Sequence, residues 1–138
     1  MANKVLDSWA LIAFFEDEPA ASQVEEMLDQ AGNNKHRLFL SAINWAEIYY
    51  SMMREVSQEA ADRHADIITR LPIEIVGSTG DLNLAKQAAI YKARYRISLA
   101  DAFAAALAKG KRAELLTGDP EFRALEGEIK LQWLNPNA

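Results

Sequence analysis

The chain has 138 residues, of which 50% are hydrophobic, and this length predicts a single domain spanning residues 1–138. Fifteen Lys and Arg against twenty Asp and Glu give a formal charge of -5, so there is no overall positive field to attract nucleic acid. A polyanionic partner would have to meet a local basic patch or bound cations. The absence of cysteine excludes disulfides, thiolate catalysis and zinc–thiolate sites.

The first residues carry no sign of a targeting segment. The stretch MANKVLDSWALIAFFEDEP has an acid within its apolar run, and it lacks both a basic region and a small-residue cleavage site, so we predict no signal peptide. No uninterrupted apolar run approaches the roughly 20 residues that span a bilayer. We therefore expect a cytoplasmic protein without a membrane association.

Short apolar runs alternate with longer helical patterns along the chain. In chain order, these patterns predict a strand at 4–6, helices at 8–16 and 20–31, a strand at 37–40, helices at 42–56 and 58–70, a strand at 73–76, helices at 80–95 and 99–109, and strands at 114–116 and 129–133. Turns are predicted at Asn33-Asn34 and Gly77-Ser78. Strands separated by helices favour a parallel sheet covered on both faces, which is a small three-layer α/β domain.

Two acids follow predicted strands. Asp7 comes after the first strand in VLDS, and Asp119 comes after the fourth strand in LLTGDPEF. Each carboxylate could simply cap a helix, and Pro120 suits the first helical position after such a cap. In a parallel sheet, however, ligands bind beyond the carboxyl ends of the strands, near the point where the strand order reverses. Both acids are expected at that edge.

Two further acids stand within apolar helices. Asp101 is the only charge in the run LADAFAAALA, where it could also form a capping box with Ser98. Glu47 lies in the apolar helix SAINWAEIYYSMM, and a glutamate buried there would need a partner or a wet cleft. A solvated surface position is the alternative for Glu47.

Converging carboxylates repel one another, and their pKa values rise unless a cation is present. Hard divalent cations with oxygen ligands, Mg²⁺ or Mn²⁺, would relieve this repulsion. His36 is expected in an exposed loop and His64 on a surface helix, so a histidine-based hydrolase has few parts available. An all-carboxylate metal site suits phosphodiester chemistry.

Four motifs in this order, VLDSWALIAFF, NWAEIYY, ISLADAFAAALA and LLTGDPEF, resemble those of the PIN-domain ribonucleases, most closely the VapC toxins of type II toxin–antitoxin systems. The likeness covers essentially the whole chain. It implies that Asp7, Glu47 and Asp101 anchor a Mg²⁺ or Mn²⁺ centre and that Asp119 is its fourth acid.

The same resemblance bears on the residues beside these acids. It implies that Thr117 orients a water molecule or a metal ligand, and it puts Glu121 where many relatives carry a further Asp. Ser8 fits the small hydroxyl residue after the first acid. Trp9 is bulkier than the small residue expected at the next position, a departure that concerns local packing or substrate access.

The resemblance further implies a PIN-like three-layer fold with a central five-stranded parallel sheet flanked by helices. The implied activity is endoribonucleolytic cleavage that leaves a 5′-phosphate and a 3′-hydroxyl. The implied substrates are structured RNAs such as tRNA or rRNA loops. The implied partners are a second copy of the chain, giving a homodimer, and a cognate antitoxin that docks on helices near the cleft.

A basic segment precedes the helix of Asp101. In YKARYR, Lys92, Arg94 and Arg96 lie among Tyr91 and Tyr95, which suggests phosphate contacts and base stacking for an RNA substrate. The same charges could equally be cations that stabilise the end of a helix.

Other classes of protein fit the pattern less well. A catalytically silent interaction module, acting by dimerisation or partner binding, would normally have lost one of the four acids. A receiver-like phosphoacceptor domain expects paired acids after the first strand, but VLDS offers only one. A phosphatase of the Asp-x-Asp type fails because Trp9 occupies the place of the second acid.

Overall fold

The computed structural model describes residues 2–77 and 82–134. Its elements, in chain order, are β1 (Ala2–Leu6), α1 (Ser8–Phe15), α2 (Ala21–Gly32), β2 (His36–Ser41), α3 (Ala42–Glu55), α4 (Gln58–Thr69), β3 (Ile73–Val76), α5 (Leu82–Arg94), α6 (Leu99–Lys111), β4 (Glu114–Thr117), the 3₁₀ helix η1 (Pro120–Leu125) and β5 (Lys130–Trp133). Within these ranges, no helix combines the length and the apolar composition needed to cross a membrane.

The strands form one five-stranded sheet in the order β3-β2-β1-β4-β5, and every neighbouring pair is parallel. This confirms the predicted fold class. The chain begins in the centre of the sheet, adds β2 and β3 on one side, and then returns to add β4 and β5 on the other. The strand order therefore reverses between β1 and β4, where Leu6 pairs with Leu116. Such a reversal is where ligands bind in sheets of this kind.

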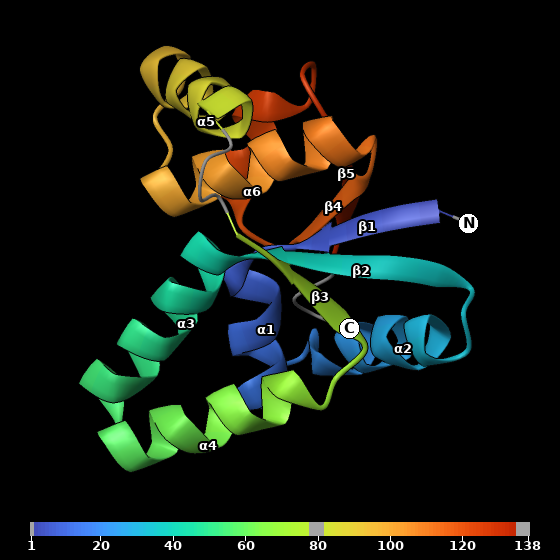
Figure 1. Ribbon diagram of the computed structural model, residues 1–138, viewed down its shortest axis with the longest axis vertical. Coiled ribbons are helices and arrows are strands. Elements are labelled where there is room, and N and C mark those ends of the chain that lie inside the picture. The colour runs from blue at the N-terminus through green and yellow to red at the C-terminus, as the bar shows by residue number, and fades with distance from the viewer. Residues whose placement is uncertain (1, 78–81, 135–138) are drawn as a thin grey trace.

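Helices cover both faces of the sheet, with α5 and α6 on one face and α1 to α4 on the other (Figure 1). Neighbouring residues of a strand point to opposite faces, so each central strand supplies both layers of the core. Val5 and Leu115 belong to the apolar cluster beneath α6, whereas Leu6 and Leu116 belong to the cluster beneath α1. This arrangement explains why the central strands read as continuous apolar runs.

Helix α6 is rich in alanine and buried on nearly all sides. Alanine is the best helix former and has the smallest side chain that still favours a helix, so α6 can lie close to the sheet. Its contacts extend to β1, β2 and β4. The consequence is that the first turn of α6, which carries Asp101, is held rigidly over the centre of the sheet.

Element bounds differ from the predicted ones by no more than two residues at the described ends. The last predicted helix runs on through Gly110 to Lys111, because Arg112 adopts a left-handed conformation (φ 51°) and ends the helix there. The predicted start of the preceding helix at 80, and Ser78 of a predicted turn, lie outside the described residues.

The expectation that His36 lies exposed in a loop is wrong. His36 is the first residue of β2 and only 4% exposed, and its Nε2 atom lies 3.0 Å from the carbonyl oxygen of Met27. His64 lies on α4 and is partly buried, with its ring stacked on Phe15. Both histidines are therefore accounted for by packing, and burial lowers the pKa of each.

Candidate active site at the carboxyl edge of the sheet

Asp7 follows β1 directly and caps the N-terminus of α1. One carboxylate oxygen, Oδ1, accepts a hydrogen bond from the backbone N–H of Ala10 at 2.9 Å, and Oδ2 accepts one from the hydroxyl of Thr117 at 2.5 Å. The side chain is 1% exposed. The predicted capping role is thus real, but Asp7 is also deeply buried beside the end of β4, which capping alone does not require.

Thr117 connects Asp7 to Asp119. It is the last residue of β4 and fully buried. Its hydroxyl donates to Asp7 and accepts a hydrogen bond from the backbone N–H of Asp119 at 3.0 Å. Asp119 in turn caps η1, because its Oδ1 accepts from the backbone N–H of Glu121 at 2.9 Å. A single hydroxyl therefore fixes the positions of two acids that follow neighbouring strands.

Asp101 lies in the first turn of α6 and is 7% exposed. Ser98 is the N-cap of this helix, and its hydroxyl oxygen accepts a hydrogen bond from the backbone N–H of Asp101 at 3.0 Å. Of the expected capping box, the half in which Ser98 caps the helix and accepts from Asp101 is present. It holds the Asp101 carboxylate near the positive end of the helix dipole, which favours an anion there.

Three acids converge at this edge. One carboxylate oxygen each from Asp101, Asp119 and Glu121 lies within 4.8 Å of the other two, a spacing that could hold a metal ion. Glu121, which stood out only through the resemblance, is brought in because η1 begins directly after Asp119 and carries Glu121 in its first turn. We call these three residues together with Asp7 the acidic edge.

Burial, helped by neighbouring carboxylates, raises the pKa values of Asp7 and Asp101. Burial raises the pKa of Asp7 from 3.8 to about 8, and the charges of Asp101 and Asp119 add to this effect, while the hydrogen bond from Thr117 opposes it. Burial, followed by the charge of Asp119, raises the pKa of Asp101 to about 7. Burial and the neighbouring carboxylates therefore disfavour the ionised forms of these two acids near neutral pH.

Glu47 lies on α3, half-buried, and stands outside the group of three converging carboxylates. Its charge nevertheless contributes to raising the pKa of Asp101, so its carboxylate faces the same volume. The half-buried position lies between the two alternatives that the sequence left open, full burial and full solvation.

Asn44 is a buried polar residue of the site that was not singled out from the sequence. It is 0% exposed, and its Nδ2 donates to the hydroxyl of Ser8 at 3.0 Å and to the carbonyl oxygen of Ala100 at 3.3 Å. Ser8 and Ala100 adjoin the two buried aspartates in sequence, so Asn44 ties α3 to the first turns of α1 and α6. Its Oδ1 is buried without a hydrogen-bond partner among the described residues. An asparagine inside the apolar stretch SAINWAE was the available signal.

The predicted RNA-binding cations occupy the end of α5 and the loop before α6. Arg94 and Arg96 are exposed there, close in sequence to the N-cap of α6. Lys92 instead donates from Nζ to the carbonyl oxygen of Ile97 at 2.8 Å, so part of its role is to close the helix end. Base stacking on Tyr91 is a wrong expectation, because this residue is 2% exposed and belongs to the core. The neighbouring Tyr95 is only partly buried.

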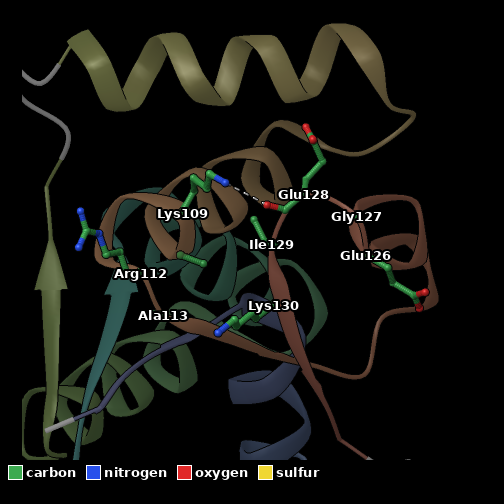
Figure 2. Close-up of a pocket in the computed structure, with 9 residues that line it drawn as sticks. Lys109, Arg112, Ala113, Glu126, Gly127, Glu128, Ile129 and Lys130 are labelled. Atoms are coloured by element: carbon green, nitrogen blue, oxygen red, sulfur yellow. Dashed lines mark hydrogen bonds between the residues drawn. The ribbon is translucent and has the colours of Figure 1, made fainter.

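A pocket of about 490 Å³ lies at the opposite edge, where β4 and β5 begin (Figure 2). We call it the basic pocket; it is lined by Ala108, Lys109, Arg112, Ala113, Glu126, Gly127, Glu128, Ile129 and Lys130. Lys109 reaches across it, with Nζ 3.4 Å from the carbonyl oxygen of Glu128. Because this is the amino edge of the sheet, far from the strand ends that carry the acids, the pocket has no part in the arrangement above.

The residues of the acidic edge fit a hard divalent cation. Mg²⁺ and Mn²⁺ prefer carboxylate oxygens, and Mg²⁺ is usually bound through one or two carboxylates with water completing its shell. Asp101, Asp119 and Glu121 supply three such oxygens at suitable spacing. A cation would also favour the ionised forms of Asp7 and Asp101, whose pKa values burial and neighbouring carboxylates raise.

Comparison with known proteins decides the family. Residues 4–128 match the PIN domain. The chain belongs to the PIN-domain family. The resemblance found in the four motifs is thereby confirmed at the level of the family. None of the curated proteins compared with the chain by sequence matches it.

Solved structures from toxin–antitoxin systems share the fold of this PIN-domain protein over nearly their whole length. The DNA-bound VapBC of Salmonella typhimurium matches with a TM-score of 0.74 and 15% identity, covering 98% of this chain and 100% of that one. VapBC2 of Rickettsia felis, bound to a promoter DNA fragment, matches with a TM-score of 0.71 and 18% identity, covering 96% and 99%. VapC20 of Mycobacterium tuberculosis, a toxin that cleaves the sarcin–ricin loop, matches with a TM-score of 0.69 and 17% identity, covering 93% and 96%. At these identities the likeness concerns the fold.

Proposed function

We propose that this PIN-domain protein is a metal-dependent endoribonuclease that acts as the toxin of a toxin–antitoxin pair. The observation that carries the proposal is the convergence of Asp101, Asp119 and Glu121 within 4.8 Å beside the buried Asp7, at the point where the strand order reverses. An active site built from carboxylates, without cysteine, suits metal-assisted phosphodiester hydrolysis. Membership of the PIN-domain family and the VapBC likenesses support the same reaction class.

The residues of the acidic edge, together with Glu47 and Thr117, have separate roles in this proposal. Asp101, Asp119 and Glu121 hold Mg²⁺ or Mn²⁺, and Asp7 and Glu47 complete the negative field around it. Thr117 orients the Asp7 carboxylate through their hydrogen bond. A bound divalent cation would activate water as a nucleophile and offset the charge on the scissile phosphate. Because the acids are held by caps and by a buried hydroxyl, little reorganisation is needed when substrate arrives.

The substrate is proposed to be a structured RNA such as a tRNA or an rRNA loop. VapC20, which shares the fold, cleaves the sarcin–ricin loop, and this supports a looped RNA target. Arg94 and Arg96 are exposed shortly before the first turn of α6 and can bind phosphates that flank the cleaved bond. Replacing both by Ala should weaken RNA binding and reduce the slope of log affinity against log salt by about 0.7 for each phosphate that the protein no longer neutralises. An unchanged slope would remove them from the substrate site.

Two protein partners are part of the proposal, a cognate antitoxin and a second copy of the chain. Several of the solved structures with this fold are toxin–antitoxin complexes, which supports the first partner. Exposed apolar side chains along α3 and at its C-cap, namely Tyr50, Met53 and Val56, repeat every three residues and so lie along one side of the helix. Such a stripe is typical of a protein contact. The reaction and both partners are expected in the cytoplasm.

The test of the enzyme uses purified protein and a labelled RNA panel that includes tRNA and an rRNA stem-loop. Cleavage should require Mg²⁺ or Mn²⁺ and stop in excess chelator. Asp7→Asn or Asp101→Asn should lower the rate about a hundredfold or more while the protein stays folded, since each removes a charge from the metal site. Lys130→Ala, a substitution in the basic pocket, is the matched control and should cleave normally. In cells, the same two aspartate variants should lose any growth inhibition.

Full activity of either aspartate variant, or activity that survives the chelator, would contradict the proposal. If the wild-type protein cleaves none of the RNAs with either metal and binds no divalent cation, the alternative of a catalytically silent PIN-like interaction module takes its place. Co-expression with the product of the neighbouring gene would then show whether partner binding alone is retained.

A further inference from the structure

The Trp9 indole covers Gly118 beside the acidic edge and leaves no room for a side chain there. Gly118 lies between Thr117 and Asp119, and Trp9 lies two residues beyond Asp7 in the first turn of α1. A methyl group placed on Gly118 would lie 2.2 Å from Cη2, 2.4 Å from Cζ3 and 2.6 Å from Cζ2 of the Trp9 indole, where real contacts stay above 3.0 Å. The indole therefore occupies the space that any other residue at 118 would need.

The glycine is required by this contact and not by its backbone conformation, because its φ lies outside the positive range that favours glycine. The indole has little freedom to withdraw. It is partly buried and packs against the apolar cluster beneath α1 that includes Leu11, Leu116 and Leu134. A flat aromatic ring held against a strand end in this way restrains the backbone that it covers.

Two separate contacts thus join the first turn of α1 to the segment 117–119. One is polar, the hydrogen bond from Thr117 to Asp7, and the other is apolar, the packing of Trp9 on Gly118. The polar contact fixes a side chain, whereas the apolar contact limits movement of the backbone. Asp119, which follows Gly118, is one of the three converging carboxylates. Any shift of Gly118 therefore moves the Asp119 carboxylate relative to those of Asp101 and Glu121.

We propose that Trp9 is a positioning residue of the active site, whose indole packs on Gly118 and holds the segment 117–119 so that Asp119 and Thr117 meet the acids of the neighbouring elements. The inference rests on the proposed nuclease function for its catalytic consequence, but the restraint on the segment exists in the metal-free protein. The large indole of Trp9 and the missing side chain of Gly118 are complementary parts of one contact.

The first experiment measures the restraint itself. In metal-free protein, amide hydrogen exchange of Asp119, whose N–H donates to Thr117, should become about tenfold faster or more in Trp9→Ala. Trp45→Ala is the matched control, because it removes a partly buried indole that stacks on Tyr49 and lies between α3 and α4. It should leave the Asp119 exchange rate unchanged. Trp9→Phe, which keeps part of the packing, should fall between wild type and Trp9→Ala, and it replaces Trp9→Ala if that variant does not fold.

A double-mutant cycle tests whether the two residues act on each other. Gly118→Ala should lower the denaturant midpoint and the rate of RNA cleavage in the presence of Trp9. In a Trp9→Ala background the same substitution should have little effect on the midpoint, because the space for the methyl group is then free. Equal effects of Gly118→Ala in both backgrounds would overturn the inferred contact.

The functional readouts are the affinity for Mn²⁺, measured on the protein alone, and the kinetics of RNA cleavage. Trp9→Ala should weaken Mn²⁺ binding about tenfold, as expected when a residue that supports the metal ligands is removed. The value of kcat should fall about tenfold to a hundredfold while KM stays within about twofold, because the ligands move but the RNA-binding residues remain in place. Trp45→Ala should change none of these values.

The outcomes separate this inference from the proposed function. If Trp9→Ala leaves the Asp119 exchange rate, Mn²⁺ affinity and kcat as in wild type, Trp9 is only a packing residue and the inference is overturned. If wild-type protein binds no Mn²⁺ and cleaves no RNA while Trp9→Ala still accelerates exchange at Asp119, the nuclease proposal fails and the positioning contact stands.

Discussion

The two edges of the sheet differ in the sign and in the solvent exposure of their charged side chains. At the acidic edge, Asp7 and Asp101 are buried, Asp119 is half-buried and Glu121 is exposed, and the pKa values of Asp7 and Asp101 rise to about 8 and about 7. At the amino edge, the basic pocket is open, and Lys109, Arg112 and Lys130 reach it from exposed positions. The first edge therefore crowds acidic groups whose ionisation is unfavourable, whereas the second presents cations that water can solvate.

The comparison shows that, in a small α/β domain, a surface pocket and a cluster of chemically reactive side chains can lie at different edges of the sheet. An exposed cation at a surface pocket contributes little to stability and needs no explanation. The buried carboxyls of Asp7 and Asp101 destabilise the fold when they ionise without a cation nearby, so their presence at one edge points to a function. Measurements of stability, cation binding and RNA cleavage can test this difference between the acidic edge and the basic pocket.

The largest expected effect is on the pH dependence of stability in metal-free protein. Asp7 and Asp101 have raised pKa values when folded and ordinary values near 3.9 when unfolded, so between about pH 4 and pH 8 the folded state binds more protons. The free energy of unfolding should therefore fall as pH rises through this window, by at most about 1.4 kcal/mol per pH unit for each carboxyl. Denaturant titrations in chelator at pH 5, 6.5 and 8 measure this slope.

In Asp7→Asn the slope should be reduced, because the amide keeps the shape of the side chain without a charge to bury. This variant should be more stable than wild type at pH 8 even though we expect it to cleave RNA about a hundredfold more slowly. Glu126→Gln, at an exposed acid of the basic pocket, is the control and should keep the wild-type slope. Equal slopes in wild type and Asp7→Asn would mean that burial of the Asp7 carboxyl has no cost.

The next effect is stabilisation by divalent cations. A cation that binds only the folded protein raises the free energy of unfolding by about 2.7 kcal/mol at a hundred times its dissociation constant. Mn²⁺ or Mg²⁺ at pH 8 should therefore raise the thermal midpoint of wild type, and Glu126→Gln should respond in the same way. Asp101→Asn should not respond, because it lacks one of the three converging carboxylates. A similar rise in Asp101→Asn would place the bound cation elsewhere.

A smaller effect is expected from Thr117→Val, which keeps the shape of a fully buried side chain. The substitution leaves Asp7 Oδ2 without its donor and the N–H of Asp119 without its acceptor, so the free energy of unfolding should fall by about 1–3 kcal/mol. RNA cleavage should slow about tenfold, equivalent to about 1.4 kcal/mol of transition-state stabilisation. Thr69→Val removes an exposed hydroxyl that bonds the carbonyl of Asp66 and is the matched control. If both variants behave alike, Thr117 has no special role.

Much of the fold was predictable because its signals are local. Every predicted strand was found, since buried parallel strands read as short apolar runs bounded by turns. The strand order was not available from these runs, because nothing in an apolar strand specifies its neighbour; it required the structure. His36 was misjudged for a related reason. A single polar residue at a strand start gives no sign that the carbonyl oxygen of Met27 lies beside it.

The site divides in the same way. Asp7, Asp101 and Asp119 were predictable in position, because strand ends and helix starts meet at one edge of a parallel sheet. Asn44, in contrast, links three helices through buried hydrogen bonds between segments far apart in the sequence. The same holds for the packing of Trp9 on a glycine that follows β4, which neither residue reveals alone.

The smallest effects are expected at the basic pocket. Lys130→Ala and Lys109→Ala remove exposed charges. Within the described ranges, the only hydrogen bond made by these two side chains is the long one from Lys109 Nζ to the carbonyl oxygen of Glu128. Each substitution should change the free energy of unfolding by no more than about 0.5 kcal/mol, as surface substitutions usually do. RNA cleavage should stay within about twofold of wild type, and the stabilisation by Mn²⁺ should persist.

The decisive comparison places both lysine variants beside Asp101→Asn in the same cleavage assay. If cleavage by a lysine variant fell as far as that of Asp101→Asn, RNA cleavage would depend on cations at the amino edge. The proposed difference between the two edges would then be wrong. If only RNA affinity fell, while kcat and Mn²⁺ binding stayed as in wild type, the pocket would hold a distant part of the RNA and the chemistry would still belong to the acidic edge. Normal values of both constants, the expected result, leave the amino edge outside the reaction.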